Sequence, residues 1–288
     1  MKKGEITSSQ LVKIILLVVG FTIVLWIFPT LLNEREVDRE ICHDSVLLRG
    51  ALPDNLNIKN LPSLKCQTRK VCLTDKIFGK GDCAEEFGED KYETIKISAD
   101  NREEEINRFV ARELADCWAM MGLGKLQIFT RKSTDEKRCV VCSRISFDKE
   151  LKEELNKKVD GLGDYVLTHE VPNQNVSYWE YLTKKRTIEN YDKNFDSFTT
   201  SGKAITFMEI GEDAFLKMTS TWVLTAVGGV LGFKVGSPGA GLYAGYFTGS
   251  LLGSALDKEI KYRTGWIFLD YNSEELKSLE CDSFENIP

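Results

Sequence analysis

The side chains best suited to chemistry in this sequence are cysteine thiols, and two of them form a Cys-x-x-Cys motif at Cys139 and Cys142. This motif is typical of a thiol–disulfide redox pair or of half a zinc site. A redox pair needs its first cysteine at the N-terminus of a helix, whereas residues 138–147 alternate apolar and polar side chains, which predicts a strand. A strand sends residues three apart to opposite faces, and no second motif completes a zinc set. We therefore favour structural disulfides or buried thiols over redox or metal chemistry.

The chain contains eight cysteines, an even number and a high one for 288 residues. Such use of cysteine is typical of an oxidising, extracytoplasmic compartment, where disulfides persist. We expect most of these cysteines to be paired and assign no connectivity. The disulfide candidates are Cys42, Cys66, Cys72, Cys83, Cys117, Cys139, Cys142 and Cys281.

The two histidines, His43 and His169, are few for a metal or acid–base enzyme. Neither has a recognisable partner motif, because the sequence contains no nucleophile elbow, no zinc-protease motif and no P-loop. The formal net charge of −6 argues against a nucleic-acid partner. The sequence thus predicts no catalytic residue, no metal site and no cofactor.

An apolar segment precedes all eight cysteines. Residues 14–32 contain no charged side chain and are long enough to cross a hydrocarbon core of about 30 Å as a helix. The segment lacks the small-residue cleavage site of a signal peptide, so we expect an uncleaved transmembrane anchor. Lys2, Lys3 and Lys13 precede it, which favours a short cytoplasmic tail at residues 1–13. The cysteines then lie outside the cytoplasm, which places the protein in the cell membrane with its main domain extracytoplasmic.

Residues 33–218 are expected to form this extracytoplasmic domain, with an α+β fold and a small sheet. The clearest helix is 101–121, whose apolar side chains recur at i, i+3 and i+4. A second helix is expected from Asp148 to Gly161, and short strands at 94–98, 126–128 and 205–207. The strand predicted at 138–147 would place on one face Cys139, Val141, Ile145 and Phe147.

Residues 219–256 are rich in glycine, and their glycines recur every four residues on either side of a Ser-Pro-Gly turn. In a helix this spacing lines one face with glycine and allows another helix to approach closely. We expect a helical hairpin inserted in the lipid bilayer, with burial inside a soluble domain as the alternative. The helix-packing candidates are Gly228, Gly232, Gly236, Gly241, Gly245, Gly249 and Gly253.

After the hairpin, residues 257–288 are expected to return to the extracytoplasmic domain. They contain a predicted strand at 265–271, which we expect to pair with 204–210 because the two segments flank the hairpin.

Four stretches carry a resemblance to a known group of proteins. They are 39–48, which begins Arg39-Glu40-Ile41-Cys42; 115–122, which contains Asp116-Cys117-Trp118; 139–145, which begins Cys139-Val140-Val141-Cys142; and 281–288. Together they resemble uncharacterised membrane-anchored proteins predicted from genomes of small-celled archaea. The resemblance spans most of the chain and implies an anchored envelope protein, with no known activity and no catalytic residue.

Three functions remain open at this point. The first is a non-enzymatic, membrane-anchored envelope protein whose glycine face mates with another copy or with another membrane protein. The second is a membrane-active or pore-forming oligomer in which glycine faces pack several hairpins together. The third is an extracytoplasmic thiol–disulfide enzyme that uses Cys139 and Cys142. The third requires these cysteines to lie at a helix start rather than along a strand.

Overall fold

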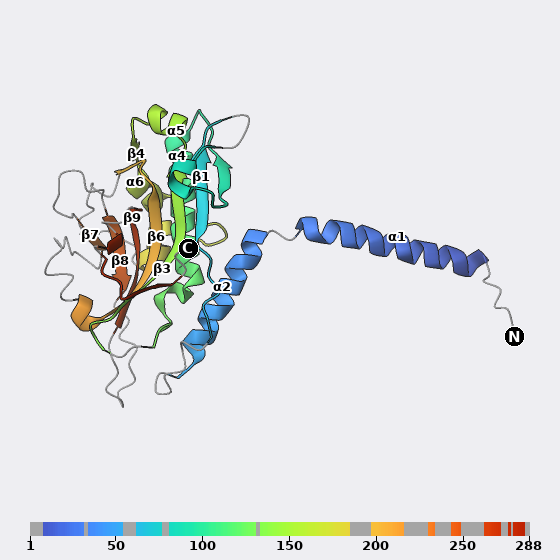
Figure 1. The fold of residues 1–288 in the computed structure, drawn as a ribbon, viewed down its shortest axis with the longest axis horizontal. Coiled ribbons are helices and arrows are strands. Elements are labelled where there is room, and N and C mark those ends of the chain that lie inside the picture. The colour runs from blue at the N-terminus through green and yellow to red at the C-terminus, as the bar shows by residue number, and fades with distance from the viewer. Residues whose placement is uncertain are drawn as a thin grey trace.

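The computed structural model describes residues 8–31, 34–53, 62–76, 81–130, 133–184, 197–215, 230–233, 243–248, 262–271, 276–277 and 279–285. They form an α+β body, built from one mixed sheet and the helices that cover it, from which one helix stands apart (Figure 1). The helices are α1 (Ser8–Leu31), α2 (Glu34–Ala51), α3 (Ala84–Phe87), α4 (Arg102–Met120), α5 (Lys149–Glu154), α6 (Leu162–Thr168) and α7 (Tyr178–Thr183), with a 3₁₀ turn, η2 (Gly122–Gly124).

The main sheet has eight described strands in the order β2-β1-β3-β6-β9-β8-β7, with β10 also pairing with β3. The strands β1, β2 and β10 run parallel to their neighbours, and the pairs from β3 through β7 are antiparallel. The strands are β1 (Arg69–Thr74), β2 (Glu93–Lys96), β3 (Lys137–Phe147), β6 (Lys203–Gly211), β7 (Val230–Phe233), β8 (Tyr243–Thr248), β9 (Tyr262–Asp270) and β10 (Ser283–Glu285), with a separate pair, β4 (Lys158–Asp160) and β5 (Ser197–Thr199).

The C-terminal strand pairs as the sequence predicts. β9 lies antiparallel to β6 along its whole length, from Lys203 opposite Asp270 to Gly211 opposite Tyr262. The expected pairing of 265–271 with 204–210 is therefore confirmed, and it places β9 inside the sheet rather than at its edge.

The helix predicted at 101–121 is confirmed as α4, and it organises the core on one face of the sheet. Its apolar stripe is buried against alternate side chains of β3, β6 and β9, while α2, α6 and α7 pack around it. Three glutamates in its first turn suit the positive end of the helix dipole. The main residues of this core are Ile106, Val110, Leu114, Trp118, Val140, Phe147, Ile205, Phe207, Trp266 and Phe268.

The strand predicted at 138–147 is present as β3, but its apolar side chains do not share one face. Cys139 and Val141 belong to the cluster on the face opposite α4, whereas Ile145 and Phe147 face α4. The register shifts between Val141 and Ser143, which marks a β-bulge. Because one extra residue reverses the alternation of side chains, the single face expected from the sequence is wrong.

Two shorter predictions need correction. The helix expected from Asp148 to Gly161 ends after Glu154, because Asn156 and Lys157 adopt positive φ and strand β4 begins at Lys158. Asp148 does cap this helix, accepting a hydrogen bond from the Leu151 backbone at 2.9 Å. The strand expected at 126–128 is absent from the described chain there, which continues from η2 as an irregular segment.

The helical hairpin expected over 219–256 is not shown. Of this stretch the structure describes only β7 and β8, and both are strands that pair with each other, while β8 also pairs with β9. Gly232 and Gly245 therefore lie in strands and do not line a helix. A spacing of four is a multiple of the two-residue period of a strand, so it lines one face in either structure. The other glycine candidates, Gly228, Gly236, Gly241, Gly249 and Gly253, lie outside the described residues.

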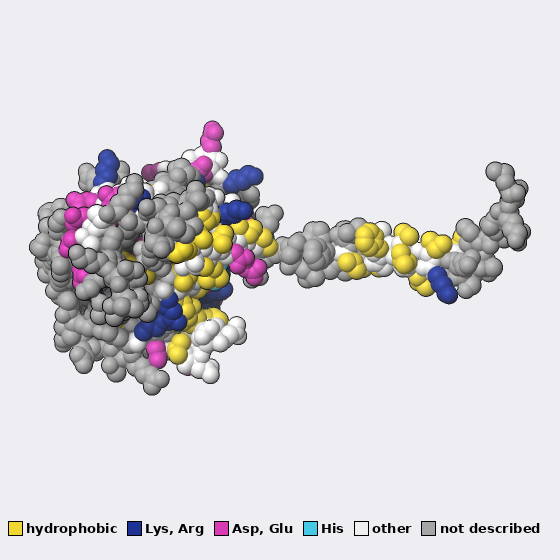
Figure 2. Space-filling view, turned by 90° about the horizontal axis from the view of Figure 1, so that it is seen from below, with side chains coloured by type: hydrophobic (Ala, Val, Ile, Leu, Met, Phe, Trp, Pro, Cys, Tyr) yellow, Lys and Arg dark blue, Asp and Glu magenta, His cyan; other side chains and the backbone are white. Residues whose placement is uncertain are grey.

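The segment expected to anchor the chain lies in α1, which projects away from the body (Figure 1). Its side chains are described at 11–24, and all of them are exposed, with Leu17 at 72% (Figure 2). Within the part of the chain that the structure describes, no helix is both long and apolar enough to cross a membrane.

Candidate functional site

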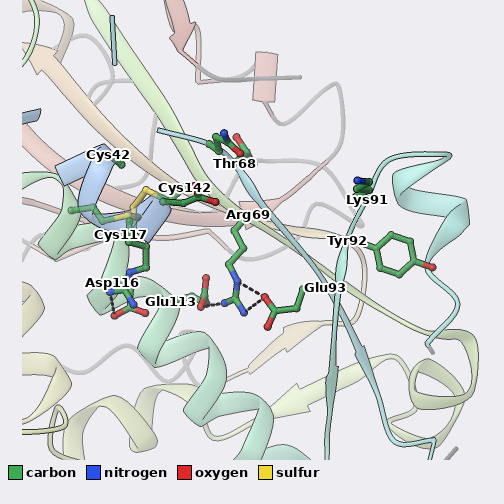
Figure 3. A pocket seen from close by; sticks show the side chains of 14 residues that line it. Cys42, Thr68, Arg69, Lys91, Tyr92, Glu93, Glu113, Asp116, Cys117 and Cys142 are labelled. Carbon is green, nitrogen blue, oxygen red and sulfur yellow. Dashed lines mark hydrogen bonds and ion pairs between the residues drawn. A yellow bond between two sulfur atoms is a disulfide. The ribbon is translucent and has the colours of Figure 1, made fainter. Parts of the chain in front are cut away.

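A groove of about 480 Å³ lies where α2, α4 and the strands β1, β2 and β3 meet (Figure 3). Its walls come from segments far apart in the sequence, so only the folded chain assembles it. Its α4 wall consists of Glu113, Asp116, Cys117 and Met120, which follow i, i+3, i+4 and i+7 spacing on one side of the helix.

Two disulfides fix the walls of the groove. Cys117–Cys142 ties α4 to β3, with Cα atoms 5.6 Å apart. Cys42–Cys66 ties α2 to the segment that leads into β1, with Cα atoms 4.3 Å apart. Each bridge therefore limits how far the two segments that it joins can separate beside the groove.

Arg69 from β1 stands at the centre of the groove and joins two carboxylates (Figure 3). It donates to Glu93 from Nε at 3.0 Å and from Nη2 at 2.5 Å, and Nη1 pairs with Glu113. The guanidinium group also lies 5.4 Å from the centre of the Phe109 ring. Glu113 is almost fully buried, so this network offsets the cost of removing its charge from water.

A second ion pair closes the other end of the groove. Arg39 from α2 pairs with Asp116 from α4 at 2.5 Å. Burial, followed by the charge of Asp116, raises the pKa of nearby Tyr181 above its ordinary value. At the strand end, a hydrogen bond from Lys70 lowers the pKa of Asp90 from its ordinary value.

The carboxylates and cysteines at the centre of the groove are engaged in contacts with other side chains. The two carboxylates at the centre are held by one guanidinium group, and the thiols of the wall are oxidised to disulfides. Among the described residues, no group of three His, Cys, Asp or Glu side chains could hold a metal ion. The groove therefore offers hydrogen-bonding and charged groups in fixed positions.

The cysteines are distributed as structural disulfides. All eight are paired, in Cys42–Cys66, Cys72–Cys83, Cys117–Cys142 and Cys139–Cys281. Cys139 and Cys142 lie on the strand β3, on opposite faces, and belong to different bridges. The requirement stated for a thiol–disulfide enzyme, a cysteine at a helix start, is not met at either position.

The histidines lie apart from this chemistry. His43 Nδ1 is 3.0 Å from the carbonyl oxygen of Met120, at the C-terminal end of α4. His169 is stacked on Tyr165, with ring centres 3.9 Å apart. The groove does not contain either ring among its lining residues.

Sequence reasoning missed the Arg69 network, although one signal was present. At 100° per residue, Glu113 falls within the apolar stripe of α4, midway between Phe109 and Cys117. A charged residue on a buried stripe indicates a buried partner. Its identity could not be read from the sequence, because Arg69 lies 44 residues away.

We expect Arg69→Met to lower the free energy of unfolding by about 3 kcal/mol, because it leaves the buried Glu113 carboxylate without its guanidinium partner. The matched control is Lys70→Met on the same strand. The partner of Lys70, Asp90, is 53% exposed, so the loss of unfolding free energy in this variant should be several-fold smaller. Urea unfolding followed by circular dichroism measures both. Equal effects from the two variants would show that Arg69 contributes only as a surface charge.

Comparison with known protein families, curated proteins and solved structures finds no match to this chain.

Proposed function

We propose that this chain is a non-enzymatic component of the cell envelope. In this proposal residues 14–32, which contain no charged side chain, anchor the chain in the membrane, and the disulfide-bonded α+β body binds a partner outside the cytoplasm. The main support for the anchor is that every described side chain of α1, from residue 11 to residue 24, is exposed. Exposed apolar surface costs about 25 cal/mol per Å² in water, so a lipid environment would relieve a large cost.

The disulfides support the extracytoplasmic side of the proposal. Four bridges that use all eight cysteines are typical of proteins that fold in an oxidising compartment, because cytosolic thiols are kept reduced. Two of these bridges, Cys42–Cys66 and Cys117–Cys142, lie beside the groove. The geometry of the groove therefore depends on the oxidation of these cysteines.

The groove supports a binding role for the body. Its charged side chains are preorganised by Arg69 and by the Arg39–Asp116 pair, which lowers the entropy lost when a partner binds. A pore of packed helical hairpins has no comparable support, because the described residues of the glycine-rich stretch are strands.

The anchor and its orientation can be tested together in whole cells. Carbonate extraction should leave the full chain with the membrane and should release a variant that lacks residues 8–31. An impermeant thiol reagent added outside should label Asn175→Cys, which lies in an exposed turn, and should not label Lys3→Cys until the cells are lysed. Release of the full chain by carbonate, or labelling of Lys3→Cys alone from outside, would overturn the proposal.

A further inference from the structure

The second helix, α2, carries an exposed apolar surface that the fold does not use. Its members, which we call the α2 stripe, are Val37, Ile41, Leu47 and Leu48, exposed by 37%, 42%, 43% and 54%. Outside α1, no other large hydrophobic side chain is exposed among the residues whose side chains the structure describes, which exclude those of β7 and β8. Figure 2 shows hydrophobic side chains gathered on the side of the body nearest to α1. Exposed apolar patches of this kind mark interaction sites.

The α2 stripe is a second apolar face, distinct from the face that holds α2 to the body. Cys42, Val46 and Arg49 are at most 3% exposed and lie against the core. Val37, Ile41 and Leu48 fall within about 40° of one another on the opposite side, at 100° per residue. Their spacing of four and then seven residues is that of a helix that packs along another helix. A helix therefore fits this surface better than a strand or a loop does.

The charges beside the stripe define what such a helix must carry. Asp44 lies between Ile41 and Leu48 on the same side, and Asp38 and Glu40 flank it; all three are exposed. The described arginines of α2 face elsewhere, because Arg39 pairs with Asp116 and Arg49 donates to the Pro62 carbonyl at 2.6 Å. The described side chains thus give the stripe three acidic groups and no basic one.

This charge pattern separates the candidate occupants. A second copy of the chain would bring a second set of Asp38, Glu40 and Asp44 to the same contact, and like charges in an interface cost roughly several kcal/mol. A lipid surface that carries anionic headgroups would be repelled in the same way, and interfacial helices usually carry lysine and arginine on their polar face. A helix with its own apolar stripe and a lysine or arginine opposite Asp44 satisfies both the apolar and the acidic groups.

We propose that the α2 stripe docks a basic amphipathic helix of another protein. Val37, Ile41 and Leu48 would pack against the apolar side chains of that helix. Asp44 would form an ion pair with a lysine or arginine of the same helix. The proposal deepens the function proposed above, since it gives the chemistry of the envelope partner. It rests on that function only for the partner's place beside the membrane, because α2 begins directly after α1.

The test uses the full chain in phosphatidylcholine nanodiscs and two synthetic helical peptides as probes. One peptide carries leucines at heptad positions with lysines beside them, and the other carries glutamate in place of each lysine. We expect the lysine peptide to bind about tenfold more tightly than the glutamate peptide. Asp44→Lys should reverse this preference, while Glu153→Lys, the same kind of charge reversal at an exposed site on α5, should leave it unchanged.

The apolar contribution is tested by Ile41→Ser combined with Leu48→Ser, which should weaken binding of the lysine peptide by at least about tenfold. Equal binding of the two peptides, or a preference that Asp44→Lys does not change, would overturn the proposal. Dimers that the serine variant abolishes would identify a second copy as the occupant, and burial of a spin label at Leu48→Cys in nanodisc lipid would identify the membrane; either result overturns it. If the chain does not insert into nanodiscs, the anchor fails, and the same titrations in detergent still decide the α2 stripe.

Discussion

Replacing Cys139 and Cys281 together by alanine should lower the free energy of unfolding by about 5 kcal/mol. This bridge joins residues separated by 142 positions, against 11, 24 and 25 for the other three. Closing a longer loop removes more entropy from the unfolded chain, so its loss costs more. The bridge also holds the C-terminal segment, including β10, against β3.

The matched control is replacement of Cys72 and Cys83 by alanine, which opens the shortest loop and should cost about 3 kcal/mol. Urea unfolding of both variants, followed by circular dichroism, gives the comparison. A loss of order at β10 should accompany only the first variant, and hydrogen exchange at residues 283–285 measures it. Equal losses of stability in the two variants would mean that loop length does not determine the contribution of these bridges.

The parts of the fold that could be predicted depend on short-range sequence patterns that fit only one kind of structure. Helix α4 has an apolar stripe long enough to exclude a strand. The pairing of β9 with β6 was also expected, although the expectation rested on a helical hairpin between them that the structure does not show. The cysteine count indicated disulfides in a similar way, since a high and even number of cysteines is typical of disulfide-bonded proteins. Connectivity could not be predicted, because it depends on which elements meet in space.

The failures have equally specific causes. Glycines four residues apart line one face of a helix and also one face of a strand, so the spacing could not separate the two. The aromatic and β-branched residues of β8, among them Tyr243, Tyr246 and Thr248, favour a strand. In β3 the alternation of apolar and polar residues looks regular in the sequence. Apolar residues stand both before and after the bulge that follows Val141, so the sequence does not reveal the change of face. A bulge is set by the neighbouring strands, which the sequence of β3 alone does not contain.

The groove was harder to predict than the fold. Arg69 and Glu93 lie on β1 and β2, and Glu113 lies on α4, so their contact exists only after the sheet and helix have packed. Nothing local in a strand distinguishes an arginine that will be largely buried, as Arg69 is, from one on the surface. The charged residue on the buried side of α4 was the one local signal.

Lys203→Met should lower the free energy of unfolding by about 4 kcal/mol. Lys203 begins β6 directly opposite Asp270, which ends β9, and the two side chains form an ion pair. They are 1% and 9% exposed, so water does not replace the lost partner. Methionine keeps the length and apolar stem of lysine and removes its charge, which leaves the Asp270 carboxylate buried beside the neutral Ser201 hydroxyl at 2.9 Å. Removal of one member of a buried pair is costly for this reason.

Two further variants decide whether the charge or the packing matters. The double variant Lys203→Met with Asp270→Leu removes both charges, so it should recover most of the lost stability, because apolar replacements of a buried pair are often neutral. Lys158→Met breaks the ion pair between Lys158 and Asp160, whose side chains are 57% and 55% exposed, respectively. This variant should lower the free energy of unfolding by less than about 1 kcal/mol. Urea unfolding of the three variants against the unmodified chain measures these differences. A double variant as unstable as Lys203→Met would show that the loss comes from altered packing at the β6–β9 edge and not from an unpaired buried charge.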